Sequence, residues 1–110
     1  MIIAIDFDGT IVADKYPEIG KLMPGAHAVI NLFYTKGHFI IINTCRTGDH
    51  LAAALNFLHE KRIKFDIVND NHPNLTKQYG VTRKVFADVY IDDRNLGGFP
   101  GWKVVFEKLL

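Results

Sequence analysis

Four short runs, apolar at nearly every position, alternate with longer segments along this chain, and this alternation is the feature that most constrains its fold. The runs are residues 2–5, 39–42, 65–68 and 89–91. Strands of this composition are typical of parallel sheets, because both faces of such a sheet are covered. Parallel neighbours also need crossovers of one hand, usually helical. We therefore predict a small Rossmann-like α/β domain with three α/β/α layers and a central parallel sheet of four strands in the order 3-2-1-4.

The segments between these runs carry signals for helices. Pro24 suits the first position of a helix, and Gly37 is placed to end it. Asp49 is a plausible N-cap for a second helix, whose apolar residues follow at i, i+3, i+4 and i+7 spacing. Residues 73–80 have room for one or two further helical turns.

Two other stretches complete the expected fold. Residues 11–23 have no sustained period and are interrupted by Pro17 and Gly20, so we expect an exposed loop or irregular hairpin over the end of the first strand. Residues 102–109 repeat apolar side chains at helical spacing. A last helix is therefore favoured there, with a fifth strand over 103–106 as the weaker alternative.

The length and composition of the chain fit a single domain. Its 110 residues, 48% of them apolar and 23% charged, can form one core, so we take 1–110 as one domain. The formal net charge is +1. This is well below the positive charge expected of a protein that contacts many backbone phosphates, but it is compatible with a local basic patch. Cys45 is the only cysteine, which excludes an internal disulfide and fits a reducing compartment. With no signal-peptide pattern and no apolar run of about 20 residues, we expect a cytoplasmic protein that does not bind membranes.

Polar residues follow three of the four predicted strands. They are Asp6 and Asp8 after the first, Thr44 after the second, and Asp92 and Asp93 after the fourth. Ligands of open parallel sheets bind beyond the carboxyl ends of the strands, so these side chains should converge. Four carboxylates in one crevice repel one another unless a cation lies among them, and an all-oxygen set suits Mg²⁺. The ion would also neutralise a phosphate dianion, so that a carboxylate beside it can act as a nucleophile.

The order of these motifs resembles a known family. Asp-Phe-Asp-Gly-Thr at residues 6–10 resembles the signature of the haloacid dehalogenase superfamily of phosphatases. Thr44 after an apolar strand resembles the second motif of that family, and Tyr90-Ile91-Asp92-Asp93 resembles its acidic fourth motif. The similarity spans residues 2–93, and it implies a Rossmann-like fold and phosphomonoester hydrolysis.

The resemblance also implies a role for each matching residue. Asp6 would be the nucleophile that forms a phosphoaspartyl intermediate, and Asp8 would be the general acid and then the general base. Thr44 would hydrogen-bond the phosphoryl oxygens. Lys84 would neutralise charge on Asp6 and the phosphate. Mg²⁺ would be held by Asp6, by the main-chain carbonyl of Asp8 and by Asp92, with Asp93 acting through water.

Two basic assignments stay open. The third motif of the family is little more than a basic residue before the fourth strand, so Lys77 and Arg83 compete with Lys84, which we favour because it lies eight residues before Asp92. Arg46 either contacts the substrate or pairs with an acidic neighbour.

The intervals between motifs leave no room for a separate cap domain. Thr10 and Thr44 are 34 positions apart, and Thr44 and Lys84 are 40 apart, and both intervals are filled by predicted core elements. The chain therefore resembles the minimal, capless members, whose sites are open. We expect a phosphorylated substrate, which is a small metabolite, a nucleotide or a macromolecular end, and a homo-oligomer is one way to cover the open site.

Two other functions remain as alternatives to a magnesium-dependent phosphatase. One is a noncatalytic module that binds phosphate or metal in the same pocket. The other is a receiver-like domain that is phosphorylated on an aspartate. A receiver would present that aspartate after its third strand, where this chain has Asn69. The sequence therefore favours the enzyme.

Overall fold

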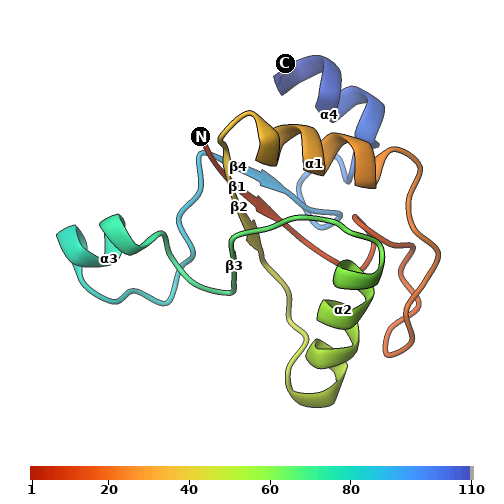
Figure 1. Cartoon of the computed structure of the whole chain (residues 1–110), viewed down its shortest axis with the longest axis horizontal. Helices are drawn as coiled ribbons and strands as arrows, with labels where there is room; N and C mark the ends of the chain where they lie inside the picture. The colour runs from red at the N-terminus through yellow and green to blue at the C-terminus, as the bar shows by residue number, and fades with distance from the viewer. Residues whose placement is uncertain (110) are drawn as a thin grey trace.

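The structure is a computed structural model that describes residues 1–109, and within them strands and helices alternate as the sequence predicts (Figure 1). The strands are β1 (Ile2–Ile5), β2 (Phe39–Ile42), β3 (Ile67–Val68) and β4 (Val89–Ile91). The helices are α1 (Ala26–Thr35), α2 (Gly48–Glu60), α3 (Pro73–Tyr79) and α4 (Trp102–Leu109). The predicted helix at the end of the chain is confirmed.

All four strands are parallel, and their order β3-β2-β1-β4 confirms the predicted topology. β1 is central, with Ile3 opposite both Ile40 and Val89. β3 is shorter than the expected run 65–68. The reason is local, because the Asp66 carboxylate accepts the Ile40 N–H at 2.7 Å, which occupies a donor that a longer strand would use.

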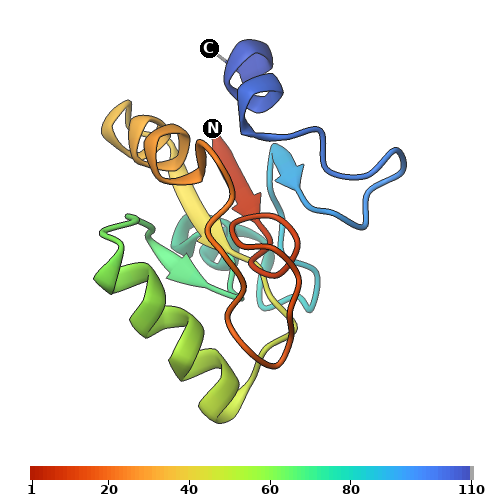
Figure 2. The same ribbon diagram turned by 90° about the vertical axis from the view of Figure 1, so that its right-hand side faces the viewer.

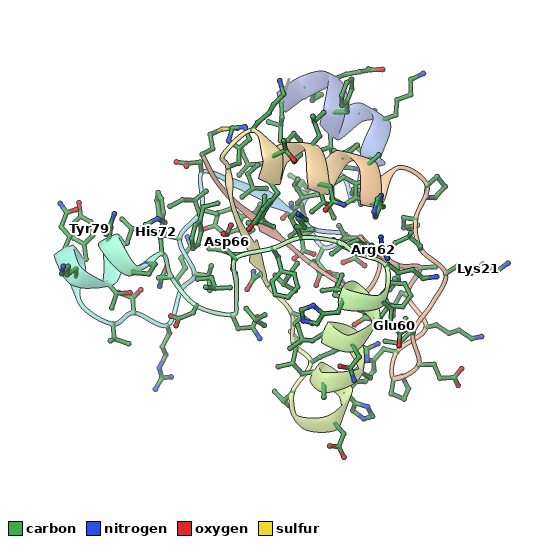
Figure 3. The ribbon with its side chains drawn as sticks, in the orientation of Figure 1. Lys21, Glu60, Arg62, Asp66, His72 and Tyr79 are labelled. Atoms are coloured by element: carbon green, nitrogen blue, oxygen red, sulfur yellow. The ribbon has the colours of Figure 1, made fainter. Side chains whose placement is uncertain are left out.

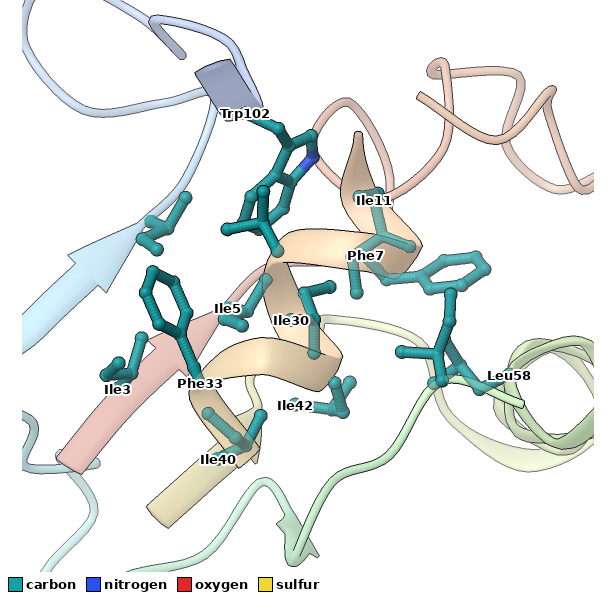
Figure 4. Close-up of a cluster of buried hydrophobic side chains, with 14 of the residues drawn as sticks. Ile3, Ile5, Phe7, Ile11, Ile30, Phe33, Ile40, Ile42, Leu58 and Trp102 are labelled. Carbon is teal, nitrogen blue, oxygen red and sulfur yellow. The ribbon is translucent and has the colours of Figure 1, made fainter. Parts of the chain in front are cut away.

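The main core lies on one face of the sheet, beneath α1, α2 and α4 (Figure 4). Alternate residues of the two central strands point into it, as strand geometry requires: Ile3, Ile5, Ile40 and Ile42. Buried residues of the three helices close over them, and α1 and α4 lie side by side in both ribbon views (Figures 1 and 2). The carboxyl ends of the strands are therefore fixed by a packed layer.

The opposite face of the sheet has a thinner cover. Ala4 and Ile41 point to this side, where Val85 and Ala87 of the segment before β4 pack against them. α3 contributes no buried residue and stands apart from the other helices (Figure 1). The layers on the two faces are thus unequal, and α3 has one side available for contacts.

Two predicted helix starts are wrong for identifiable reasons. Pro24 and Gly25 form a type II turn, in which Gly25 has φ +83° and the Ala26 N–H donates to the Met23 carbonyl, so α1 begins two residues later than expected. Thr47, in extended backbone, is the N-cap of α2, and Asp49 lies in the first turn, where a negative charge still favours the helix dipole. The end of α1 before Gly37 is confirmed.

None of the described helices has the length and apolar character needed to cross a membrane.

Residues 11–23 form the expected irregular hairpin over the end of β1. Val12 pairs with Leu22, and the Ala13 N–H donates to the Lys21 carbonyl. The hairpin is joined to the far end of the chain by Trp102, whose buried Nε1–H donates to the Thr10 carbonyl at 2.9 Å. α4 therefore supports the loop that carries the first motif.

We predict that Trp102→Phe lowers the free energy of unfolding by about 1–3 kcal/mol, because it leaves the Thr10 carbonyl buried without its donor while most of the ring packing is kept. Urea unfolding followed by circular dichroism measures the change. Phe106→Leu on the exposed side of the same helix is the control and should change stability by less than about 0.5 kcal/mol. Equal losses in the two variants would contradict a specific role for the hydrogen bond.

Candidate functional site

The carboxyl edge of the sheet carries an open cavity of about 450 Å³. Six residues predicted from the sequence line it: Asp6, Asp8, Thr44, Arg46, Asp92 and Asp93. The Asp6 N–H donates to the Ile91 carbonyl at 2.9 Å, which fixes the end of β1 beside the end of β4. This contact continues the pairing of β1 with β4 and places the first motif beside the fourth.

Gly9 allows the two acidic motifs to approach closely. It has φ +82°, a conformation that favours glycine, and a Cβ at this position would collide with the Asp93 carboxylate. The turn around it is closed by hydrogen bonds from the Gly9 N–H to Val12 and from the Ile11 N–H to Phe7. The glycine of the first motif therefore has a direct role in placing an acidic side chain of the fourth.

Asp6, Asp92 and Asp93 form a carboxylate triad in which one oxygen of each lies within 4.8 Å of the others. Burial, the charge of Asp92 and a hydrogen bond with Asp93 together raise the pKa of the Asp6 carboxyl to about 8, and burial is the largest cause. A bound cation would remove this penalty. The donor set consists of carboxylate oxygens only, which fits a hard ion such as Mg²⁺.

Asp8 does not join the triad, because its carboxylate is held by Arg46. The Arg46 Nε and Nη2 groups donate to the two Asp8 oxygens, both at 2.7 Å. The remaining N–H groups of Arg46 donate to the carbonyls of Pro17, Glu18 and His50. All five donors of this guanidinium are used, and the side chain is only 1% exposed.

Arg46 therefore pairs with an acidic neighbour, which was one of its two open readings. Its guanidinium also lies over the rings of Phe7 and Tyr16, at 5.3 and 5.0 Å from their centroids. Because a bidentate contact with Asp8 and three carbonyl contacts would have to break before it bound a phosphate, the structure favours a positioning role for Arg46. It joins the first motif, the hairpin and α2.

Thr44 keeps a free donor for a ligand. Its N–H donates to the Asn69 side chain at 2.7 Å, and its Oγ1 accepts the Arg46 N–H at 3.1 Å. The hydroxyl hydrogen is not used in either contact. Thr44 can therefore donate into the cavity that it lines.

The structure does not bring Lys84 or Lys77 to this cavity. Lys84 is exposed and lines a different hollow, beside α3, and Lys77 lines a third one. The physical reason is the path of residues 80–88, which run along the thinly covered face of the sheet back to the amino end of β4, where the Asp88 side chain accepts the Ile2 N–H. The number of residues between Lys84 and Asp92 does not predict this path.

Four other residues line the site and were not among those predicted: Asp14, Tyr16, Cys45 and Arg94. Arg94 and Arg46 are the two cations in the lining, and only Arg94 is exposed. Arg94 directly follows the acidic pair in the sequence, and its main-chain N–H donates to the Asp92 carboxylate at 2.8 Å. That adjacency was the available sequence signal for Arg94. Asp14 and Tyr16 depend on how the hairpin folds over the site.

The raised pKa of Asp6 predicts how the metal-free protein responds to pH. Between its ordinary value of 3.8 and about 8, the folded state holds this proton while the unfolded state has lost it, so the contribution to stability falls as pH rises through that window. Asp6→Asn removes the titration. In EDTA, we expect the variant to gain stability relative to the wild type between about pH 5 and about pH 8, measured by urea unfolding at each pH. A difference between the two proteins that does not depend on pH would contradict the assignment.

Comparisons with known proteins complete the description of the site. No family model matches the chain, and no curated protein matches it. A solved structure of a conserved protein coded by a locus from Bacteroides thetaiotaomicron is 38% identical and has a TM-score of 0.90, and the alignment covers 99% of this chain and 88% of that one. A chain in the structure of the Pnkp1/Rnl/Hen1 RNA repair complex is 20% identical with a TM-score of 0.58, and the alignment covers 84% of this chain and 36% of that chain. The second likeness concerns the fold alone.

Proposed function

The chain belongs to the family of the conserved Bacteroides thetaiotaomicron protein, and we propose that it is a magnesium-dependent phosphomonoester hydrolase of the haloacid dehalogenase type. The observation that supports this best is the carboxylate triad of Asp6, Asp92 and Asp93 at the meeting point of β1 and β4. Burial and the neighbouring acids raise the pKa of Asp6 and so disfavour its ionised form. A bound cation would favour that ionised, nucleophilic form. The single cysteine accords with a cytoplasmic setting for this activity.

Asp6 is the proposed nucleophile. Mg²⁺ held by Asp6, Asp92, Asp93 and the main-chain carbonyl of Asp8 would supply positive charge to the triad and to the phosphate. An Asp6 carboxylate oxygen forms a bond to phosphorus as the bond to the leaving oxygen breaks. A water molecule then attacks the phosphorus of phospho-Asp6, which releases inorganic phosphate and restores the carboxylate.

Asp8 is the proposed proton carrier for both steps. It gives a proton to the leaving oxygen in the first step and accepts one from the attacking water in the second. Because Arg46 donates to both oxygens of Asp8, one of these contacts has to lengthen before the carboxyl group carries a proton. In the second step the same pair of hydrogen bonds holds Asp8 as an oriented base.

Thr44 and Arg94 are the proposed ligands of the phosphoryl oxygens. Thr44 has an unused hydroxyl hydrogen, and Arg94 is the exposed cation of the cavity lining. This gives Arg94 the charge-neutralising role that the family resemblance implied for Lys84. The open cavity accepts a phosphate on a metabolite, a nucleotide or a macromolecular end, and a second copy of the chain is one possible cover.

The decisive experiment is phosphate release by the purified protein with Mg²⁺, using p-nitrophenyl phosphate and a panel of phosphorylated sugars, nucleotides and oligonucleotides. We expect activity that EDTA abolishes and Mg²⁺ restores, and a loss of at least about 1,000-fold in kcat for Asp6→Asn. Asp49→Asn, which removes the same charge from an exposed position on α2, is the control and should stay within about threefold. Activity that survives in verified metal-free buffer would rule the mechanism out. A protein that binds Mg²⁺ without turnover would instead be a noncatalytic module.

The two candidate cations can be separated with a small substrate. On p-nitrophenyl phosphate, we expect Arg94→Gln to lower kcat/KM by about 10- to 100-fold, because it removes the charge that faces the phosphate. Lys84→Gln should change kcat/KM by less than about threefold, since its side chain lines another hollow. The reverse result would return the neutralising role to Lys84.

A further inference from the structure

A second hollow lies between α3 and the chain segment that leads to β4, and its volume is about 500 Å³. We call it the α3 groove, after the residues that define it: Asn71, Leu75, Tyr79, Thr82, Lys84 and Phe86. Both aromatic side chains that line it are exposed to solvent, Tyr79 by 70% and Phe86 by 48%. Figure 3 shows Tyr79 on the outer part of α3, away from the sheet.

The walls of the groove are held in place by one buried side chain. The Asn71 amide donates to the Lys84 carbonyl at 3.1 Å and to the Thr82 hydroxyl at 3.3 Å, and it accepts the Phe86 N–H at 2.7 Å. These bonds fix the segment before β4 against the start of α3. The groove is therefore formed before any ligand enters.

Cations outnumber acids around the groove. Residues 71–87 contain Lys77, Arg83 and Lys84 and no aspartate or glutamate. The flanking acids are Asp70, which lines the hollow beside Lys77, and Asp88, whose carboxylate accepts the Ile2 N–H. All three cations are exposed, and none of them forms an ion pair with another residue of 1–109. Lys77 lines an adjoining hollow that shares Asn71 and Thr82 with the groove. The net charge of +1 for the whole chain therefore conceals a local basic patch.

This combination of features selects one class of ligand. A second copy of the chain would bring like charges together in a two-fold interface, which disfavours it. Exposed aromatic rings beside unpaired cations suit a strand that offers both flat bases and phosphates. We propose that the α3 groove binds single-stranded nucleic acid, with bases against Tyr79 and Phe86 and backbone phosphates beside Lys77, Arg83 and Lys84.

A short stretch of chain connects the groove with the candidate active site. The Asn69 side chain accepts the N–H of Thr44, which lines the site, and Asn71 lines the groove. The Cα atoms of Asn69 and Asn71 are at most about 7 Å apart, because only one residue separates them. The start of α3 lies beside the amino end of β2, where the centroids of the His72 and Phe39 rings are 4.4 Å apart. A bound strand would therefore have to run from the groove along residues 69–71 to bring its terminal phosphate to Asp6 at the carboxyl edge. This part of the inference rests on the proposed function.

The test measures binding without hydrolysis. Fluorescence anisotropy with labelled ten-residue oligothymidine and oligouridine, neither with a terminal phosphate and both in EDTA, reports on the groove alone. We expect Lys77→Gln/Arg83→Gln to weaken binding more than about tenfold and to make the slope of log K against log salt less negative by about 1.4, or about 0.7 for each lost contact. Tyr79→Ser should weaken binding by about fivefold or more with no change in slope, because stacking releases no counterions.

The matched control is Lys21→Gln/Lys103→Gln, which removes the same charge from exposed positions outside the groove and should stay within about twofold. No saturable binding by the wild type, or an equal loss in the control, would overturn the proposal. Equal binding of polyglutamate would assign the groove to an acidic protein instead. A dimer in sedimentation velocity that Tyr79→Ser converts to a monomer would assign it to a second copy, and either result rejects nucleic acid.

A second measurement separates this proposal from the proposed function. If the protein hydrolyses phosphate, the ratio of kcat/KM for a phosphorylated oligonucleotide to that for p-nitrophenyl phosphate should fall at least about fivefold in Lys77→Gln/Arg83→Gln. An unchanged ratio would reject the groove as a substrate site while leaving the hydrolase intact. Oligonucleotide binding in a protein without turnover would instead reject the hydrolase and keep the groove.

Discussion

The ion pair between the buried Arg46 and the half-buried Asp8 is the interaction on which the arrangement of the site depends. One guanidinium joins the first motif, the hairpin over it and α2, through two carboxylate contacts and three carbonyl contacts. Removing one partner of such a pair leaves an uncompensated charge, which typically costs about 3–5 kcal/mol. The position of the hairpin and the orientation of Asp8 are therefore coupled through Arg46, so a change in one alters the other.

A second constraint acts at the triad. Asp6, Asp92 and Asp93 are brought together by the backbone pairing of β1 and β4 and by the absence of a side chain at Gly9. The fold thus holds acidic groups closer than their charges favour. Burial at this end of the sheet, together with the nearby acids, raises the pKa of Asp6. This crowding, together with the all-oxygen donor set, is the reason that we propose a hard cation at this position.

The sequence was a good guide wherever the signal was local or set by strand topology. The apolar runs predicted the four strands and their order, and the strand-end acids predicted the residues that meet at the carboxyl edge. Predictions failed where a particular side chain or turn intervened, as with Asp66 at the start of β3 and the turn at Gly25 before α1. Lys84 was expected at the site because of its spacing, but spacing does not reveal that residues 80–88 cross the far face of the sheet. The hydrogen bonds of Arg46 come from segments that are distant in the sequence, so no motif could have predicted them.

The order of the strands has a consequence for how copies of this chain meet one another. The two shortest strands, β3 and β4, occupy the edges, and they pair over two and three residues. An edge this short offers few free N–H and C=O groups to an incoming strand, so it is a poor template for sheet extension. The short length of its edge strands therefore protects the fold against edge-to-edge aggregation.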